Sequence, residues 1–350
     1  MLKGLKVIDL STVLAGPSVG TFFAELGADV IKLEHPDFGD VTRSWKLPIE
    51  KADSKISAYF SSVNYGKNYG TINLKVEAER DRFLEEIKDT DILISNFKKG
   101  DATKFGIEDK VLFAKNPKLI HGKITGYGED SDRVAFDLIL QAESGFMSIN
   151  GTPESGPVKM PVALIDVLSA HHLKEAILLA LYERERTGKG KAVAVSLYDA
   201  AVSSLVNQAS NYLMTGFVPQ RIGSKHPNIA PYGELFKTKD GATVTFAIGS
   251  NTHFRKLCEV LGVDDLSENQ RFKNNQDRVV NRSALFELLE RPVADRIAEE
   301  LLSALEKINV PAGKVRNLAE VFDDPLSQQL IIEEDIDGTP TRRVKSVLFK

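Results

Sequence analysis

Cysteine and tryptophan are nearly absent from this sequence, which holds one residue of each in 350. A single cysteine cannot form a disulfide within the chain, and it excludes Cys-x-x-Cys motifs and metal sites made of several cysteines. Cys258 is spaced with Leu257 and Leu261 as on a buried helix face, so we expect a core residue. This cysteine usage fits a protein of the reducing cytoplasm.

An excess of either charge is also lacking, since 45 lysines and arginines face 49 aspartates and glutamates. The resulting formal charge of −4 gives no overall attraction for nucleic acid or anionic lipid. No stretch approaches the roughly 18 uninterrupted apolar residues of a membrane span, and the first residues lack the apolar segment of a secretory signal. We therefore expect no nucleic acid or membrane partner, and any anionic ligand must meet a local group of cations.

Histidines are few and scattered. They are His35, His121, His171, His172, His226 and His253. Neither His-Glu-x-x-His nor a pair four residues apart occurs among them, and no phosphate-binding P-loop is present. The sequence therefore predicts no metal site.

The first 200 residues alternate short β-like runs with helix-like segments, which is typical of βαβ units around a mostly parallel sheet. The expected strands are 5–10, 30–34, 71–74, 91–96, 119–125 and 192–197, and the expected helices are 17–26, 76–88, a short one before 116, 136–146, 166–186 and 200–213. The long helix is apolar on nearly all sides, so we expect it to be buried all round. The pattern predicts an α/β fold of the doubly wound type for residues 1–220.

The character of the chain changes at residue 221. Segment 221–232 has two prolines and no hydrophobic period, which is typical of a linker. Two short strand-like runs then flank Asp240-Gly241, a hairpin turn signal, and segments with helical spacing follow. A length of 350 residues also favours two domains. We therefore expect a smaller α+β domain at 221–318 and a return segment at 319–350.

Two enzyme motifs occur in partial form near the N-terminus. Ser18 stands in a Gly-x-Ser-x-Gly sequence between a strand and a helix, as in serine hydrolases. Pro17 restricts the backbone there and no acid–histidine pair stands out, so we favour a turn with a prolyl helix start. Glu34 closes the second strand, where an acid could bind ribose hydroxyls. Since the Gly-x-Gly-x-x-Gly spacing is missing, nicotinamide binding is not favoured.

The sequence around Asp166 allows two interpretations of its carboxylate. An apolar run, 161–165, leads directly into it, ahead of the long helix. As a helix N-cap it would stabilise the protein by about 0.5–2 kcal/mol. As a desolvated carboxylate it could act as a nucleophile that the helix N-terminus keeps ionised. The residues alone favour the N-cap and leave the second interpretation open.

A series of blocks, in order along the chain, resembles the family III CoA-transferases, also called the CaiB/BaiF family. They are 7–17 (VIDLSTVLAGP), 26–34 (LGADVIKLE), 39–43 (GDVTR), 96–97 (NF), 124–128 (ITGYG), 136–137 (FD), 183–190 (ERERTGKG) and 226–232 (HPNIAPY). The resemblance implies a Rossmann-like large domain joined to the smaller domain, and two ring-like subunits interlocked as a homodimer. It implies transfer of CoA between an acyl-CoA and a carboxylic acid, with CoA as a substrate and no tightly bound cofactor.

By this resemblance Asp166 falls on the family's catalytic aspartate, which forms a mixed anhydride and then an aspartyl-CoA thioester, and Asp137 falls on an acidic residue close to it. The positions where the family binds CoA are here Val13, Ala15, His35, Ile72, Lys75, Asn96, Phe97 and Lys104. Further cations near this set are Lys98, Lys99 and Arg133. Such cations could hold the phosphates of CoA.

Three features depart from the family pattern. Leu14 stands where some members have a glutamine that can donate to the reacting carbonyl. Phe136 stands where the family's racemases have a histidine, and it cannot exchange a proton, which argues against a racemase. The sequence stops near the point where members return to the large domain. A catalytically weak acyl-CoA-binding protein and a serine hydrolase using Ser18 are therefore the alternatives to a CoA-transferase.

Overall fold

The computed structural model describes residues 1–349 of the chain and divides into two compact units. Within the described residues, the first unit comprises 1–148, 159–219 and 329–349, and the second comprises Ile149–Val158 and Gln220–Gln328. The two units are defined by the contacts between residues. The domain boundaries expected from the sequence remain a prediction. No helix within residues 1–349 combines the length and the apolar character needed to cross a membrane.

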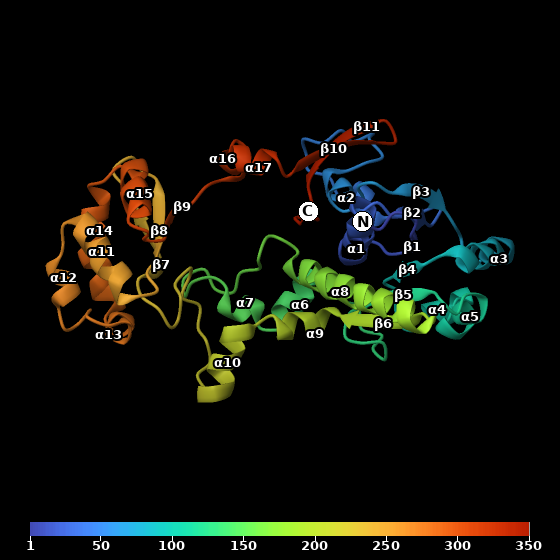
Figure 1. Cartoon of the computed structure of the whole chain (residues 1–350), viewed down its shortest axis with the longest axis horizontal. Coiled ribbons are helices and arrows are strands. Elements are labelled where there is room, and N and C mark those ends of the chain that lie inside the picture. Colours follow the sequence, from blue (N-terminus) through green and yellow to red (C-terminus); the bar gives the residue numbers. More distant parts are fainter. Residues whose placement is uncertain (350) are drawn as a thin grey trace. The chain divides into compact units, whose positions relative to one another are not determined.

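The first unit is built on a six-stranded sheet in the order β3-β2-β1-β4-β5-β6, in which every neighbouring pair is parallel (Figure 1). The strands are β1 (Lys6–Asp9), β2 (Asp29–Glu34), β3 (Asn68–Thr71), β4 (Ile92–Ser95), β5 (Ile120–Thr125) and β6 (Lys191–Ser196). The predicted α/β class with a mostly parallel sheet is confirmed. Because all six strands run in the same direction, the loops that follow them gather at one edge of the sheet.

The third strand lies three residues earlier than expected. A strand was expected at 71–74, but β3 ends at Thr71, so Ile72 and Leu74 lie beyond it. Both side chains are instead buried in an apolar cluster after the strand has ended. Burial of alternate residues in a loop therefore imitated the period of a strand.

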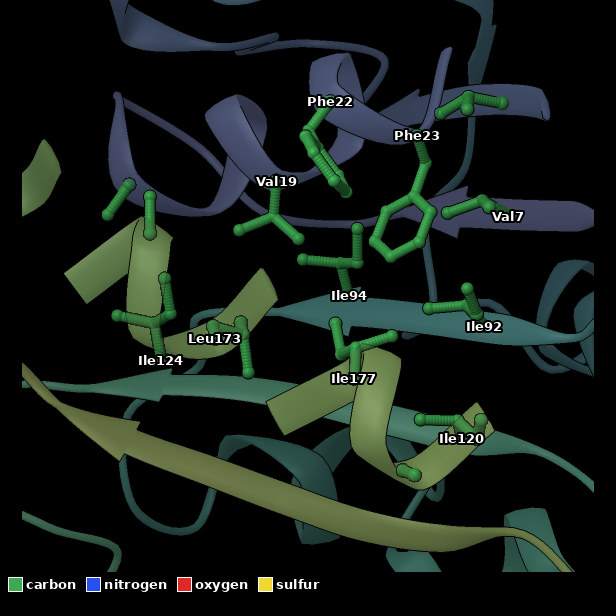
Figure 2. Packing of buried hydrophobic residues seen from close by; sticks show 14 of the residues in the cluster. Val7, Val19, Phe22, Phe23, Ile92, Ile94, Ile120, Ile124, Leu173 and Ile177 are labelled. Carbon is green, nitrogen blue, oxygen red and sulfur yellow. The ribbon is translucent and has the colours of Figure 1, made fainter. Parts of the chain in front are cut away.

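Helices cover both faces of this sheet. The helices up to residue 215 are α1 (Ala15–Glu25), α2 (Ala58–Ser62), α3 (Glu77–Glu86), α4 (Asp101–Phe105), α5 (Asp109–Lys115), α6 (Asp137–Glu143), α7 (Phe146–Ile149), α8 (Leu164–Thr187), α9 (Leu197–Ser203) and α10 (Val206–Thr215). Of these, α7 and α10 have no buried residue. Figure 2 shows one apolar core, in which Phe23 of α1 and Ile177 of α8 meet Ile94 of β4. A second cluster around Phe83 and Leu93 fills the opposite face.

Two expectations for the long helix α8 were wrong. It begins at Leu164, so Asp166 is its third residue and not its N-cap; the N-cap is Ala163, which makes no side-chain capping bond. The helix is also not buried all round, because Leu179 is 69% exposed and Tyr182 is 64% exposed. The apolar residues that suggested a fully buried helix therefore form one core face and one exposed face.

The second unit has a three-stranded sheet in the order β7-β8-β9, packed on helices. Its elements are β7 (Tyr232–Lys237), β8 (Thr243–Ala247), β9 (Ala312–Lys314), α11 (Asn251–Leu261), α12 (Asp265–Glu268), α13 (Asn275–Val280), α14 (Arg282–Ala294), α15 (Ala298–Lys307), α16 (Leu318–Phe322) and α17 (Pro325–Gln328). The predicted hairpin at Asp240-Gly241 is confirmed by antiparallel β7 and β8, and Cys258 is buried in the core as expected.

The chain then re-enters the first unit as a hairpin of β10 (Ile331–Ile336) and β11 (Thr339–Val344). Ile336 is buried against Ile56 and Phe60. Arg343 forms an ion pair with Glu25 of α1, and both side chains are nearly inaccessible to solvent.

Candidate active site

The cavity of interest, about 480 Å³ in volume, lies in the first unit where the loops after β1, β4 and β5 meet the first turn of α8. Its walls come from 12–15, 95–100, 123–126 and 133–137, together with Asp166 and other side chains. Since these segments follow neighbouring parallel strands, the topology of the sheet brings them together.

Asp166 enters this cavity from the first turn of α8 and is 7% exposed. Burial, reinforced by the nearby charge of Asp137, raises the pKa of its carboxyl to about 7. The N-terminus of the helix therefore does not hold the group ionised, contrary to expectation. Its carboxylate accepts no hydrogen bond from residues 1–349, so no donor there offsets the effect of burial.

Asp137, the first residue of α6, performs the capping that Asp166 was expected to perform. Its Oδ1 accepts a hydrogen bond of 2.8 Å from the backbone N–H of Ile165, in the first turn of α8. Its Oδ2 accepts one of 2.7 Å from Nε2 of Gln141. Asp137 thus fixes the start of α8 and places a negative charge near Asp166.

Gln141 is a site residue that the sequence did not reveal. Its side chain is completely buried, and its Oε1 accepts a hydrogen bond of 2.8 Å from the backbone N–H of Met160. It therefore ties the segment that leads into α8 to Asp137 on α6. The only available signal was its position four residues after Asp137, which places both on one helix face.

The loop after β1 is held in a strained shape at the cavity wall. Val13 has a φ of 75°, which is rare for a β-branched residue. Its N–H donates to Oδ2 of Asp40 at 3.2 Å. The side chain of Asn96 holds Thr12, the residue before Val13. It accepts a hydrogen bond from the N–H of Thr12 at 3.1 Å and donates one to the carbonyl of Thr12 at 2.9 Å.

Beneath this loop lies a group of completely buried charges. Lys67 lies 2.8 Å from Asp9, and Lys32 lies 3.1 Å from Asp40 while also donating to the carbonyl of Ser11 at 2.6 Å. Burial lowers the pKa of Lys67 to about 8. Burial opposes ionisation of Asp9, but the two lysines outweigh it and lower the pKa of that carboxyl. The two ion pairs thus support the loop from below.

The cavity gathers half of the residues at which CoA binding was expected. Val13, Ala15, Asn96 and Phe97 line it together with Asp166 and Asp137. The flanking cations Lys98, Lys99 and Arg133 line it as well. Arg133 is paired with Glu143 at 2.8 Å, whereas the side-chain ammonium of Lys98 makes no hydrogen bond or ion pair with residues 1–349.

The other four expected CoA positions do not line this cavity. His35 borders a second cavity of about 680 Å³ and stacks on Phe38. Ile72 is buried, Lys75 is exposed just beyond it, and Lys104 pairs with Asp101 at 3.0 Å. His35, Ile72 and Lys75 nevertheless follow β2 and β3 at the same edge of the sheet. Their role in CoA binding remains a prediction.

Two of the three departures from the family pattern lie at the cavity. Leu14 is the N-cap residue of α1 and Phe136 is the N-cap residue of α6, and both side chains line the cavity. Neither has a group that could donate or exchange a proton. Within residues 1–349, no group of three or more His, Cys, Asp or Glu side chains is arranged to hold a metal ion.

The two partial motifs near the N-terminus do not form the sites that they suggested. Ser18 lies inside α1, which begins at Ala15, so Pro17 stands in the first turn of the helix, as expected, and no strand-to-helix elbow exposes Ser18. Ser18 does not line the cavity either. The carboxylate of Glu34 is occupied by Arg43, with bonds of 2.7 and 2.8 Å, and is therefore not open to a ribose.

Comparison with known proteins identifies the class to which this arrangement belongs. The model for CoA-transferase family III matches residues 2–349, and the chain belongs to this family. Curated relatives that are named CoA-transferases are 33–37% identical over 92–99% of the chain. The chain is therefore an enzyme that transfers CoA, as its motif blocks indicated.

Individual relatives show how far the similarity extends. The succinate–glutarate CoA-transferase of Agrobacterium fabrum is 37% identical over 99% of this chain and 89% of its own length. The acetyl-CoA:oxalate CoA-transferase of Acetobacter aceti is 36% identical over 92% of this chain and 82% of its own length. A CaiB/BaiF family protein from Brucella suis has a solved structure that matches with a TM-score of 0.85 and 39% identity, over 99% of this chain and 92% of that one.

Proposed function

We propose that this enzyme moves CoA from an acyl-CoA donor to a carboxylic acid by way of Asp166. The observation that carries the proposal is the carboxyl of Asp166, which is buried, unpartnered within residues 1–349 and raised in pKa to about 7, in a cavity walled by family motif blocks. Poor hydration makes a carboxylate a better nucleophile once it is ionised.

In the proposed reaction the Asp166 carboxylate attacks the thioester carbonyl of the donor. The C–S bond breaks, and CoA thiolate leaves a mixed anhydride on the enzyme. The thiolate then attacks the Asp166 carbonyl, which releases the donor acid and forms an aspartyl-CoA thioester. Attack by the acceptor carboxylate gives a second anhydride, and the thiolate finally takes the new acyl group and frees Asp166. Each step exchanges one activated acyl bond for another, so no further energy source is needed.

The surrounding residues would supply position and charge. Asp137 and Gln141 fix the first turn of α8 and hence the carboxyl that reacts. Lys98, whose side-chain ammonium has no partner among residues 1–349, could meet a phosphate of CoA at the cavity wall. Burial of the site keeps water from hydrolysing the anhydrides. Holding the reacting groups in a fixed geometry lowers the entropic cost of bringing them together.

The substrates that we propose are short dicarboxylic acids and their CoA thioesters. Relatives at 33–37% identity are named for succinate, glutarate and oxalate. Such acids carry a second carboxylate, which the cations near the cavity could hold.

We further propose a Rossmann-like mode of CoA binding, a cytoplasmic location and a homodimer. The exposed apolar side chains of α8 and α10 support the dimer, since Leu179, Leu213 and Met214 are each at least 69% exposed. The alternative that retains support is an acyl-CoA-binding protein with weak activity, because Leu14 lacks a donor for the reacting carbonyl.

The test is to trap the enzyme-bound acyl group. The purified protein is incubated with succinyl-CoA or acetyl-CoA, quenched with hydroxylamine, and its peptides are examined by mass spectrometry. A hydroxamate on the Asp166 peptide supports the proposal, and Asp166→Asn should lose both the hydroxamate and CoA transfer to glutarate or oxalate. The matched control is Asp132→Asn, an exposed residue outside the cavity wall, which should keep both. Transfer that persists in Asp166→Asn would overturn the mechanism, and CoA binding without a hydroxamate would favour the binding protein.

A further inference from the structure

A serine, a histidine and an aspartate form a hydrogen-bonded chain in the wall of the same cavity. Oγ of Ser95 lies 2.8 Å from Nε2 of His121, and Nδ1 of His121 lies 2.7 Å from Oδ1 of Asp109. All three residues line the cavity. These are the separations expected between a nucleophile, its general base and the group that orients the base.

The charge on Asp109 determines which atom of each hydrogen-bonded pair donates and which accepts. The hydrogen bond from His121, together with a further bond of 2.8 Å from Lys123, lowers the pKa of Asp109 to about 2. An ionised carboxylate can only accept hydrogen bonds, so Nδ1 of His121 must carry the proton between them. In the neutral ring Nε2 is then the acceptor, and the hydroxyl of Ser95 donates to it.

The three residues come from three separate elements. Ser95 ends β4, His121 is the second residue of β5, and Asp109 is the first residue of α5. Ser95 and His121 are buried, and the partner of His121 across the sheet is Leu93, which belongs to the apolar cluster on that face. Three hydrogen-bonded polar side chains beside an apolar cluster break the usual pattern of core packing. Such exceptions occur mainly at functional sites.

We infer that Ser95 is a second nucleophile of this enzyme, which hydrolyses activated acyl esters and thioesters with His121 as its base. Oγ of Ser95 attacks the acyl carbonyl while its proton passes to Nε2 of His121. The leaving alcohol or thiol takes that proton as the C–O or C–S bond breaks, which leaves an acyl-serine. Water then attacks the acyl-serine, gives its proton to His121 and releases the acid, and Ser95 regains the proton. This activity does not depend on Asp166 or on the proposed CoA transfer.

The first experiment needs no variant. The wild-type protein is treated with a fluorophosphonate probe, and the modified peptide is identified by mass spectrometry. Modification of Ser95 is expected; a folded wild-type protein in which Ser95 stays unmodified would overturn the inference.

The second experiment follows hydrolysis of p-nitrophenyl acetate. Ser95→Ala and His121→Gln should each lose at least about 100-fold in rate, the usual contribution of positioned acid–base groups. The fluorophosphonate modification of Ser95 is measured without CoA transfer, so failure of the transfer mechanism and failure of this inference are distinguishable. The matched control is Ser144→Ala, a buried serine whose hydroxyl donates to the carbonyl of Leu140 at 2.6 Å. Equal rates in wild type and Ser95→Ala would refute the role of Ser95.

Discussion

Replacement of Asp166 by asparagine should stabilise the protein at alkaline pH. The folded state holds this carboxyl at a pKa of about 7, whereas the ordinary value is 3.8. The folded state therefore binds the proton more tightly than the unfolded state, and stability falls as the pH rises from about 4 to about 7. Asparagine has a similar shape and no charge to bury, so the variant escapes this loss.

The size of the effect follows from the two pKa values. Between pH 5 and pH 7 the unfolded carboxyl is ionised while most of the folded protein keeps the proton, and each pH unit then costs about 1.4 kcal/mol. The advantage of Asp166→Asn over wild type should thus grow by about 2–3 kcal/mol between pH 5 and pH 8. For a folding unit of about this size, such a change in unfolding free energy corresponds to a difference of roughly 5–10 °C in melting temperature.

The assay is thermal unfolding of both proteins at pH 5, 7 and 8, with Asp132→Asn as the exposed control. The difference between Asp166→Asn and wild type should widen with pH, while that between the control and wild type should stay constant. An advantage of Asp166→Asn that is constant or shrinks with rising pH would refute the assigned burial and raised pKa of this carboxyl.

Three further perturbations test the loop after β1. Lys67→Met removes the ion-pair partner of buried Asp9 and leaves only Lys32 nearby, which should cost about 3–5 kcal/mol in unfolding free energy; the double variant with Asp9→Asn should recover much of this. Gly16→Ala adds a Cβ that collides with the side chain of Ser11, and the melting temperature should drop by an amount equivalent to about 1–3 kcal/mol. Asp40→Ala removes the acceptor that holds the strained loop, and the KM for acyl-CoA should rise about 10-fold; an unchanged KM would mean that the loop does not position the substrate.

The regular part of the fold could be predicted from the sequence because its signals are local. Parallel strands buried on both faces form short apolar runs, and five of the six expected runs overlap strands of the sheet closely. The sixth failed at Ile72 because an apolar loop residue can be buried as well as a strand residue. The period of the apolar residues indicates which side chains are buried. It identifies a strand only where the backbone also pairs with a neighbouring strand.

The candidate site was only partly predictable, because its contacts join distant segments. An aspartate before an apolar helix is usually a cap, but the cap of α8 comes from Asp137, 28 residues before Ile165. No local pattern could show that Asp166 was thereby left free. Ser95 and His121 are likewise 26 residues apart, and only the pairing of β4 with β5 brings them together.

The β10–β11 hairpin has a consequence for how the chain matures. The second unit is inserted into the first, whose last segment begins only at Gln329. Until that segment has left the ribosome, Phe60 lacks Ile336 as a neighbour and Glu25 lacks Arg343. The unit that holds the candidate active site is thus assembled from segments made before and after the second unit, and it gains these last contacts only once the β10–β11 hairpin has been synthesised.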